Sequence, residues 1–312
     1  MQFMDKLKMN SEEPISQTQR ERLAYIDFRL YFLGELRRQD ILDRFGVGPA
    51  VATRDITQYR SLYSENIAFE GSTKTYLITN EFKPAFEHNI ERVLTVLSHG
   101  FGDGINSIKG SLINCVLPIT LNRPSVSILA PITRGIYRRK AVSVQYSSHS
   151  SGANKREIIP FTLVNDGLRW HVRSFDRKSQ EFRDFVLTRM KSAVFLEDSI
   201  IEIHESIEHD NEWNRVVELE IVPHPARTRP EVISSDYGME NGVLKIKIRA
   251  AIVGYFLRQW IVDCSPDHSL VGEEFRLWLK DSLVLYGVNN ALLAPGYKNP
   301  ALSNINVKPV SF

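Results

Sequence analysis

The chain has 312 residues, of which 43% are hydrophobic and 24% charged, and its formal net charge is +2. These values are ordinary for a soluble globular protein with two or three domains, and they exclude an intrinsically disordered chain. Hydrophobic runs such as residues 250–257 are far shorter than the roughly 20 residues of a membrane-spanning helix. No hydrophobic block follows Lys6 and Lys8 to form a secretory signal, so we expect a cytoplasmic protein.

The charge is distributed unevenly along the chain. Residues 1–130 hold 15 basic and 15 acidic side chains, residues 131–193 hold 13 and 5, and residues 194–312 hold 11 and 17. The excess of cations in the middle segment predicts an anionic partner for one domain, although a solvated basic face would give the same count. The two cysteines, Cys115 and Cys264, lack metal-ligand spacing, and we expect neither a metal site nor a cofactor.

Three helices are predicted near the N-terminus. Thr18 and Glu21 have capping-box spacing and predict a helix that extends to about Arg38. A short helix over residues 40–45 ends at a glycine turn, and Pro49 begins the next helix. The outward positions of this last helix are small, polar or basic, which indicates a helix-turn-helix whose DNA-contacting residues are Thr53, Arg54, Thr57 and Gln58.

Residues 66–78 predict a hairpin directly after this unit, which makes the helix-turn-helix a winged one. At its tip, Ser72, Thr73 and Lys74 are expected to contact DNA. The alternative is a three-helix bundle with a hairpin of no function. Residues 1–76 hold 11 basic and 11 acidic residues, so a basic face has to come from their arrangement and from two copies acting together.

Helices are next predicted over residues 87–97 and 132–140, separated by a proline-punctuated connector. Short strands with turns near Gly152 and Gly167 then indicate a small half-open barrel, in which Pro160 marks an edge or a bulge. In residues 168–173, alternation places Leu168, Trp170 and Val172 toward a core, and Arg169, His171 and Arg173 on a cationic face. The last part predicts strands over 215–222 and 243–249 and helices over 250–261 and 272–285.

A winged head followed by "VQYSS", Pro160, the Asp166-Gly167 turn, "FRDF" and Arg189 resembles the WYL-domain transcriptional regulators. Trp170-His171-Val172 stands where that family has Trp-Tyr-Leu, and "RWHVR" resembles the BrxR and CapW type of repressors beside bacterial phage-defence operons. The resemblance implies a multidomain α+β fold. It comprises a winged head (1–95), a connector (96–130), an Sm-like WYL barrel (131–193) and a C-terminal dimerisation domain (194–312).

The resemblance also implies a function. We expect a homodimeric repressor of a phage-defence operon that binds pseudo-palindromic double-stranded DNA and is nucleoid-associated when bound. An anionic nucleotide or nucleic acid in the WYL pocket would release it. The matching pocket residues, which we expect to converge on one side of the barrel, are Tyr146, Ser148, Arg156, His171, Arg173, Arg183 and Arg189. Guanidinium groups match phosphate oxygens in geometry, but surface ion pairs would explain any single arginine equally well.

Two other functions fit the same chain. A ligand-dependent activator would need the same head and the same pocket as a repressor. A nucleic-acid-processing enzyme would need clustered carboxylates for metal ions, and acidic residues are scarce in residues 131–193. We therefore expect a regulator without enzymatic activity.

Overall fold

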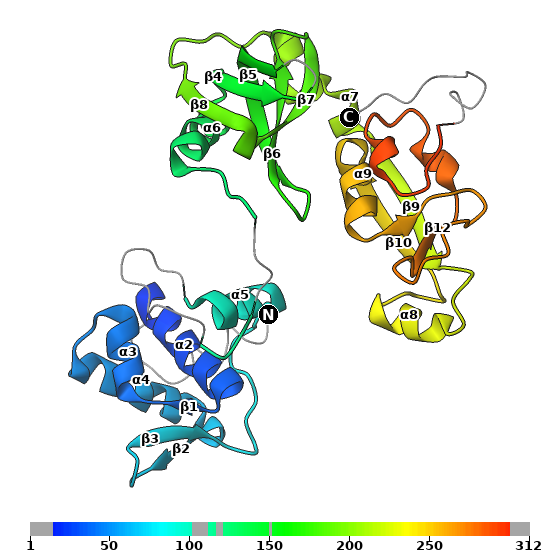
Figure 1. The fold of residues 1–312 in the computed structure, drawn as a ribbon. Coiled ribbons are helices and arrows are strands. Elements are labelled where there is room, and N and C mark those ends of the chain that lie inside the picture. Colours follow the sequence, from blue (N-terminus) through cyan, green and yellow to red (C-terminus); the bar gives the residue numbers. More distant parts are fainter. Residues whose placement is uncertain (1–14, 102–111, 117–120, 150–151, 300–312) are drawn as a thin grey trace. The chain divides into compact units, whose positions relative to one another are not determined.

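The computed structural model of the chain describes residues 15–101, 112–116, 121–149 and 152–299 (Figure 1). The chain divides into two compact units, residues 1–119 and residues 120–312, and each is considered separately. Within the described residues, no helix is both long and apolar enough to cross a membrane.

The first unit contains the three predicted helices: α2 (Gln17–Leu33), α3 (Arg38–Phe45) and α4 (Pro49–Leu62). The predicted limits of α2 were wrong at both ends. Ser16 rather than Thr18 caps the helix, because its hydroxyl accepts a hydrogen bond from the backbone N–H of Gln19. Gly34 ends it in the left-handed conformation, at a φ of 76°, and the chain turns there into a strand.

The predicted hairpin is present as β2 (Ile67–Glu70) and β3 (Thr75–Ile78). A short strand that was not predicted, β1 (Glu35–Leu36), pairs with β3 and makes a three-stranded sheet in the order β1-β3-β2. Strand β1 lies between α2 and α3, so its pairing with β3 joins the wing to the helices. Strand β2 is left at the edge of the sheet. Helix α5 (Ile90–His99) follows, three residues later than predicted, with Asn89 as its cap.

A buried carboxylate joins the parts of this unit. Asp27 of α2 is fully buried and accepts hydrogen bonds from the Tyr59 hydroxyl of α4 at 2.5 Å and from the Ala85 backbone N–H at 3.0 Å. His88 Nε2 lies 2.9 Å from the same carboxylate. Burial and, as the second contribution, the charge of the neighbouring Asp27 carboxylate raise the pKa of the Tyr59 hydroxyl above its ordinary value. This hydroxyl therefore remains a donor.

The second unit begins with α6 (Val126–Arg138), which packs on a five-stranded sheet (Figure 1). The prediction of a helix starting at residue 132 was wrong. Pro131 lies inside α6 and removes one backbone hydrogen bond of the helix. The burial of Ile128 and Ile132 against the sheet offsets the stability lost with that bond. The strands are β4 (Val142–Ser148), β5 (Gly152–Asn165), β6 (Trp170–Asp176), β7 (Glu181–Val186) and β8 (Met190–Phe195), in the order β7-β6-β5-β4-β8.

Of the two alternatives predicted for Pro160, an edge or a bulge, the structure shows the bulge. The register between β5 and β6 shifts between Pro160 and Thr162, so Pro160 is accommodated in a strand with neighbours on both sides. The turn between β5 and β6 is also as predicted. Gly167 has a φ of +84°, and a side chain there would meet Gln259 at 2.7 Å.

The C-terminal part places helices against a four-stranded sheet in the order β10-β9-β12-β11. Its elements are α7 (Asn211–Asn214), β9 (Val216–Pro223), α8 (Pro230–Asp236), β10 (Leu244–Arg249), α9 (Ala250–Gln259), β11 (Val262–Asp263) and β12 (Leu277–Leu279). The prediction of a helix over 272–285 was wrong. Leu277 and Leu279 are buried on either side of Trp278, whose indole N–H bonds to the Ser265 carbonyl, and this alternation is that of a strand.

Replacing Asp27 by alanine should destabilise the first unit by about 3 kcal/mol or more, because several buried donors lose their acceptor. All four tryptophans lie in the second unit. Thermal unfolding followed by far-ultraviolet circular dichroism should therefore show an earlier helix transition, while the tryptophan fluorescence transition stays in place. Asp43→Ala, which removes an exposed carboxylate of α3, should change neither signal.

Candidate functional site

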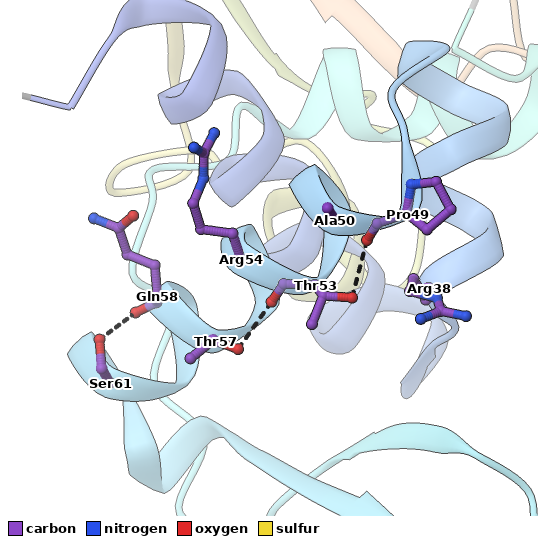
Figure 2. Close-up of a pocket in the computed structure, with 8 residues that line it drawn as sticks. All are labelled: Arg38, Pro49, Ala50, Thr53, Arg54, Thr57, Gln58 and Ser61. Atoms are coloured by element: carbon purple, nitrogen blue, oxygen red, sulfur yellow. Dashed lines mark hydrogen bonds between the residues drawn. The ribbon is translucent and has the colours of Figure 1, made fainter.

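The exposed side of α4 forms an open hollow in the first unit (Figure 2). Its lining includes all four residues of α4 predicted to contact DNA, together with others from α3 and α4: Arg38, Pro49, Ala50, Thr53, Arg54, Thr57, Gln58 and Ser61. Two of these residues are arginines, and none of the described lining residues is acidic. A domain with balanced charge thus presents a positive surface at its helix-turn-helix.

The acidic residue of α4 does not oppose this surface, because it faces inward. Asp55 is fully buried, and its Oδ2 lies 2.6 Å from Nε of Arg22 on α2. The hydroxyls of Thr53 and Thr57 donate to backbone carbonyls one turn earlier in α4, each at 2.9 Å. Their remaining lone pairs and their methyl groups are therefore what these residues offer outward.

The wing residues Ser72, Thr73 and Lys74 are exposed at the tip of the hairpin. The hydroxyl and backbone N–H of Ser72 both donate to the carboxylate of Glu70, at 2.8 and 3.1 Å, and these hydrogen bonds lower the pKa of Glu70. Lys74 takes the left-handed conformation, at a φ of 53°, which closes the turn. Ser72 thus has a turn-forming role, and Lys74 is the exposed cation of the tip.

The strand register divides the predicted WYL-pocket residues between two faces. Arg183 lies on the β-sheet face that carries the core residues Val172 and Phe185. His171 and Arg173 alternate with Val172 and lie on the opposite face. The expectation that all these residues converge on one side was therefore wrong. The predicted core face of residues 168–173 was wrong in part, because Leu168 is 71% and Trp170 43% exposed.

The residues on the core face are mostly engaged with other groups. Tyr146 is buried, and its hydroxyl accepts a hydrogen bond from the Val186 backbone N–H. Arg156 forms an ion pair with Asp176, and Ser148 is half-buried at the end of β4. The more open cations are Arg183, half-exposed and paired with the exposed Glu181, and Arg189, whose Nη2 lies 2.8 Å from His149 Nε2.

On the opposite face, His171 contacts helix α9 of the C-terminal part. Its Nε2 donates to Asp166 at 3.0 Å, and its ring lies against that of Tyr255, with 5.0 Å between centroids. Arg258 of α9 donates to the same Asp166 oxygen at 2.9 Å. Burial alone would raise the pKa of Asp166. Hydrogen bonds from the Arg169 backbone and from His171 outweigh it, and the pKa lies below its ordinary value.

Arg173 lies between two carboxylates. Its Nε and Nη2 donate to Asp210, at 2.6 and 2.9 Å, and its Nη1 lies 3.2 Å from Asp184. Asp210 also caps α7, and Asp184 also accepts the Tyr255 hydroxyl at 2.9 Å. Burial would lower the pKa of Arg173, but the hydrogen bonds that it donates to these carboxylates and their negative charges raise it, so the guanidinium stays charged. Predicted as an accessible cation, Arg173 is only 5% exposed.

Comparison with known proteins assigns all three regions. Family models match as the BrxR winged helix-turn-helix domain over residues 18–99, the WYL domain over 127–195 and the BrxR C-terminal dimerization domain over 216–285. The DNA-binding transcriptional repressor CapW of Pseudomonas aeruginosa is 30% identical over 82% of this chain and 89% of its own. The chain belongs to the BrxR and CapW family. The family resemblance expected from the sequence is thereby confirmed, as is the α+β multidomain fold.

Other members of the BrxR and CapW family show the same coverage. The CapW repressor of Escherichia coli (strain KTE188) is 29% identical over 86% of this chain and 91% of its own. The CapW repressor of Stenotrophomonas maltophilia is 28% identical over 84% of this chain and 93% of its own. Among the described residues of this member, no group of three or more histidine, cysteine, aspartate or glutamate side chains is arranged to hold a metal ion.

Sequence reasoning missed several residues of these sites. Arg38 lines the hollow on α4 as the first residue of the preceding helix, α3, and the Arg37-Arg38 pair was the signal in the sequence that could have indicated it. Contacts to the WYL domain come from 37 to 92 residues further along the chain, where Asp210 bonds to Arg173, Tyr255 to Asp184 and Arg258 to Asp166. No local pattern marks such partners.

Replacing Arg173 by alanine should lower the stability of the second unit by about 3–5 kcal/mol, because the buried Asp210 and the partly buried Asp184 would lose their cation. Tryptophan fluorescence measures this unit alone and should show a lower urea midpoint. Arg183→Ala, which removes a half-exposed cation of the neighbouring strand, should leave the midpoint nearly unchanged. Equal midpoints for the two variants would contradict a buried, structural Arg173.

Proposed function

We propose that this chain represses transcription as a homodimer that binds a pseudo-palindromic operator in the bacterial cytoplasm. The observation that carries the proposal is the hollow on α4, which is lined by two arginines and four hydrogen-bonding side chains without an acidic neighbour among the described lining residues. The relatives named repressors favour repression over activation. The proposed target is a phage-defence operon, as the family resemblance implies.

The roles of the two DNA-contacting elements follow from their chemistry. A recognition helix lies in the major groove, where Arg54 and Gln58 can donate to base edges and the threonines can contact methyl groups or phosphates. The wing tip offers Lys74 to the phosphate backbone. The family model for residues 216–285 supports dimerisation, and a two-fold axis would place the half-sites about one helical turn, or a multiple of it, apart.

The WYL domain supplies the proposed sensor for an anionic nucleotide or nucleic acid. The accessible cations Arg183 and Arg189 are suited to contact phosphate groups. Arg173 and His171 are buried on the opposite face of the sheet from Arg183, where carboxylates from three segments of the chain occupy them. An anion that reaches Arg173 competes with Asp210 for the same guanidinium edge, and its binding would loosen the contact between β6 and the segment before α7.

Lys74→Ala should weaken binding to operator and to unrelated DNA alike, and the slope of log affinity against log salt should decrease by about one unit per protomer. Arg54→Ala should instead weaken operator binding selectively, because a base contact is worth about 1–3 kcal/mol of discrimination. Fluorescence anisotropy on both DNAs over a salt series measures these effects.

Arg60→Ala is the matched control for these variants. Arg60 is an exposed cation of α4 that does not line the hollow, so its loss should leave both affinities nearly unchanged. A footprint without two-fold symmetry on DNA upstream of the gene, or a larger effect from Arg60→Ala than from Arg54→Ala, would contradict the proposal.

Asp210→Asn should make the repressor release operator at lower effector concentrations. The asparagine still caps α7 through its oxygen, but it no longer brings a negative charge to Arg173, so the effector meets a weaker competitor. Nucleoside triphosphates and short single-stranded oligonucleotides are the probes, and operator release is followed by anisotropy.

Arg183→Ala should shift the same release curve to higher effector concentrations, with operator affinity unchanged in the absence of effector. Glu181→Gln serves as its matched control, because it frees Arg183 from its ion pair without removing the cation. Release curves that coincide for wild type, Asp210→Asn and Arg183→Ala would show that the effector binds elsewhere or that no anion of these classes is sensed.

A further inference from the structure

Gln58 differs from its neighbours on the outer side of α4. Thr53, Arg54 and Thr57 are exposed, whereas Gln58 is half-buried and hydrogen-bonded to another helix. Its Oε1 lies 2.7 Å from Nε2 of Gln19, in the first turns of α2 and 39 residues earlier in the chain. Figure 2 shows Gln58 and Arg54 extending from the same side of α4.

The contact belongs to a chain of four side chains. Arg22 Nε donates to Oδ2 of Asp55 at 2.6 Å, and Oδ1 of Asp55 accepts from Nε2 of Gln19 at 3.1 Å. The same Gln19 nitrogen donates its second hydrogen to Gln58. Arg22 and Asp55 are both buried, so the chain begins in the core and ends at the surface of the hollow.

This chain fixes the orientation of both amide groups. The carboxylate of Asp55, paired with Arg22, only accepts hydrogen bonds, so the Gln19 atom beside it has to be the nitrogen. This nitrogen then donates both of its hydrogens, one to Asp55 and one to Gln58. The Gln58 atom that faces it therefore has to be the oxygen, and a reversed Gln58 amide would place two donors against each other.

We propose that Gln19 is a positioning residue that sets the base preference of Gln58, an inference that rests on the proposed operator binding. With Oε1 held by Gln19, Gln58 presents its Nε2 hydrogens to the hollow, and no described residue accepts a hydrogen bond from them. The base edge that Gln58 meets has to offer an acceptor, such as a purine N7, guanine O6 or thymine O4.

Holding the side chain in advance also favours selectivity. A glutamine that rotates freely can turn either its oxygen or its nitrogen to a base, and so it discriminates poorly between donor and acceptor edges. The restrained Gln58 has lost this choice before it meets DNA, which is the arrangement that lowers the entropic cost of a specific contact.

The test uses the full-length protein and a panel of operators in which each base pair of both half-sites is changed in turn. Gln58→Met first identifies the position at which discrimination is lost. Gln19→Met, which keeps the length of the side chain but removes its hydrogen bonds, should reduce discrimination at that same position by about fivefold, the factor corresponding to one hydrogen bond. Discrimination at the other positions should not change.

Gln17→Met is the matched control, because Gln17 is an exposed glutamine of the same helix that bonds only to Glu21 among the described residues. It should leave the whole profile unchanged. If Gln19→Met reproduces the wild-type profile, or weakens binding equally for every sequence, then Gln19 does not position Gln58. A wild-type protein that distinguishes no operator from unrelated DNA would instead refute the proposed function itself.

Discussion

A charge that is taken out of water has to meet an opposite charge inside the protein, and Arg173 on β6 meets two. Asp210 binds two nitrogens of its guanidinium and Asp184 a third. These carboxylates come from the segment before α7 and from β7, and each makes one more contact, as the cap of α7 and as the acceptor of Tyr255. Strand β6 is thereby tied to its own sheet and to the C-terminal part. The WYL domain and the following domain thus share a buried polar contact, not only a chain connection.

The same constraint explains how a head without excess charge presents a cationic surface. Asp55 lies on the helix that carries Arg54, but it faces the core and is neutralised there by Arg22. Burial of this ion pair removes one positive and one negative charge from the surface without changing the net charge. The exposed arginines Arg38 and Arg54 then remain on the hollow, without an acidic side chain among its described lining. Two such heads on one dimer would double the cationic surface offered to DNA.

His171 gives β6 a second link to α9, through Asp166 and the ring of Tyr255. Arg258 of α9 binds the same Asp166 carboxylate. Any ligand that changes the pairing of His171 or Arg173 therefore acts on α9 and α7 directly. In this arrangement the proposed coupling between sensing and the C-terminal domain needs no long pathway, because His171 and Arg173, which are proposed to respond to the ligand, also make the contact between the domains. Reciprocity requires that whatever strengthens this contact also opposes the ligand.

Local sequence determined the elements whose residues interact with near neighbours: the glycine turn and Pro49 before α4, the wing hairpin, the bulge at Pro160 and the turn at Gly167. It failed where partners lie far apart in the chain. Period-two burial of Leu277 and Leu279 depends on pairing with β9, and the burial of Arg173 and His171 depends on Asp210 and Tyr255 of the C-terminal part. The sequence by itself therefore identified which residues carry charge and hydrogen-bonding groups on the head and the WYL domain. Only the tertiary structure decided which of them face solvent and which are neutralised, because a charge is satisfied by whatever the fold brings next to it.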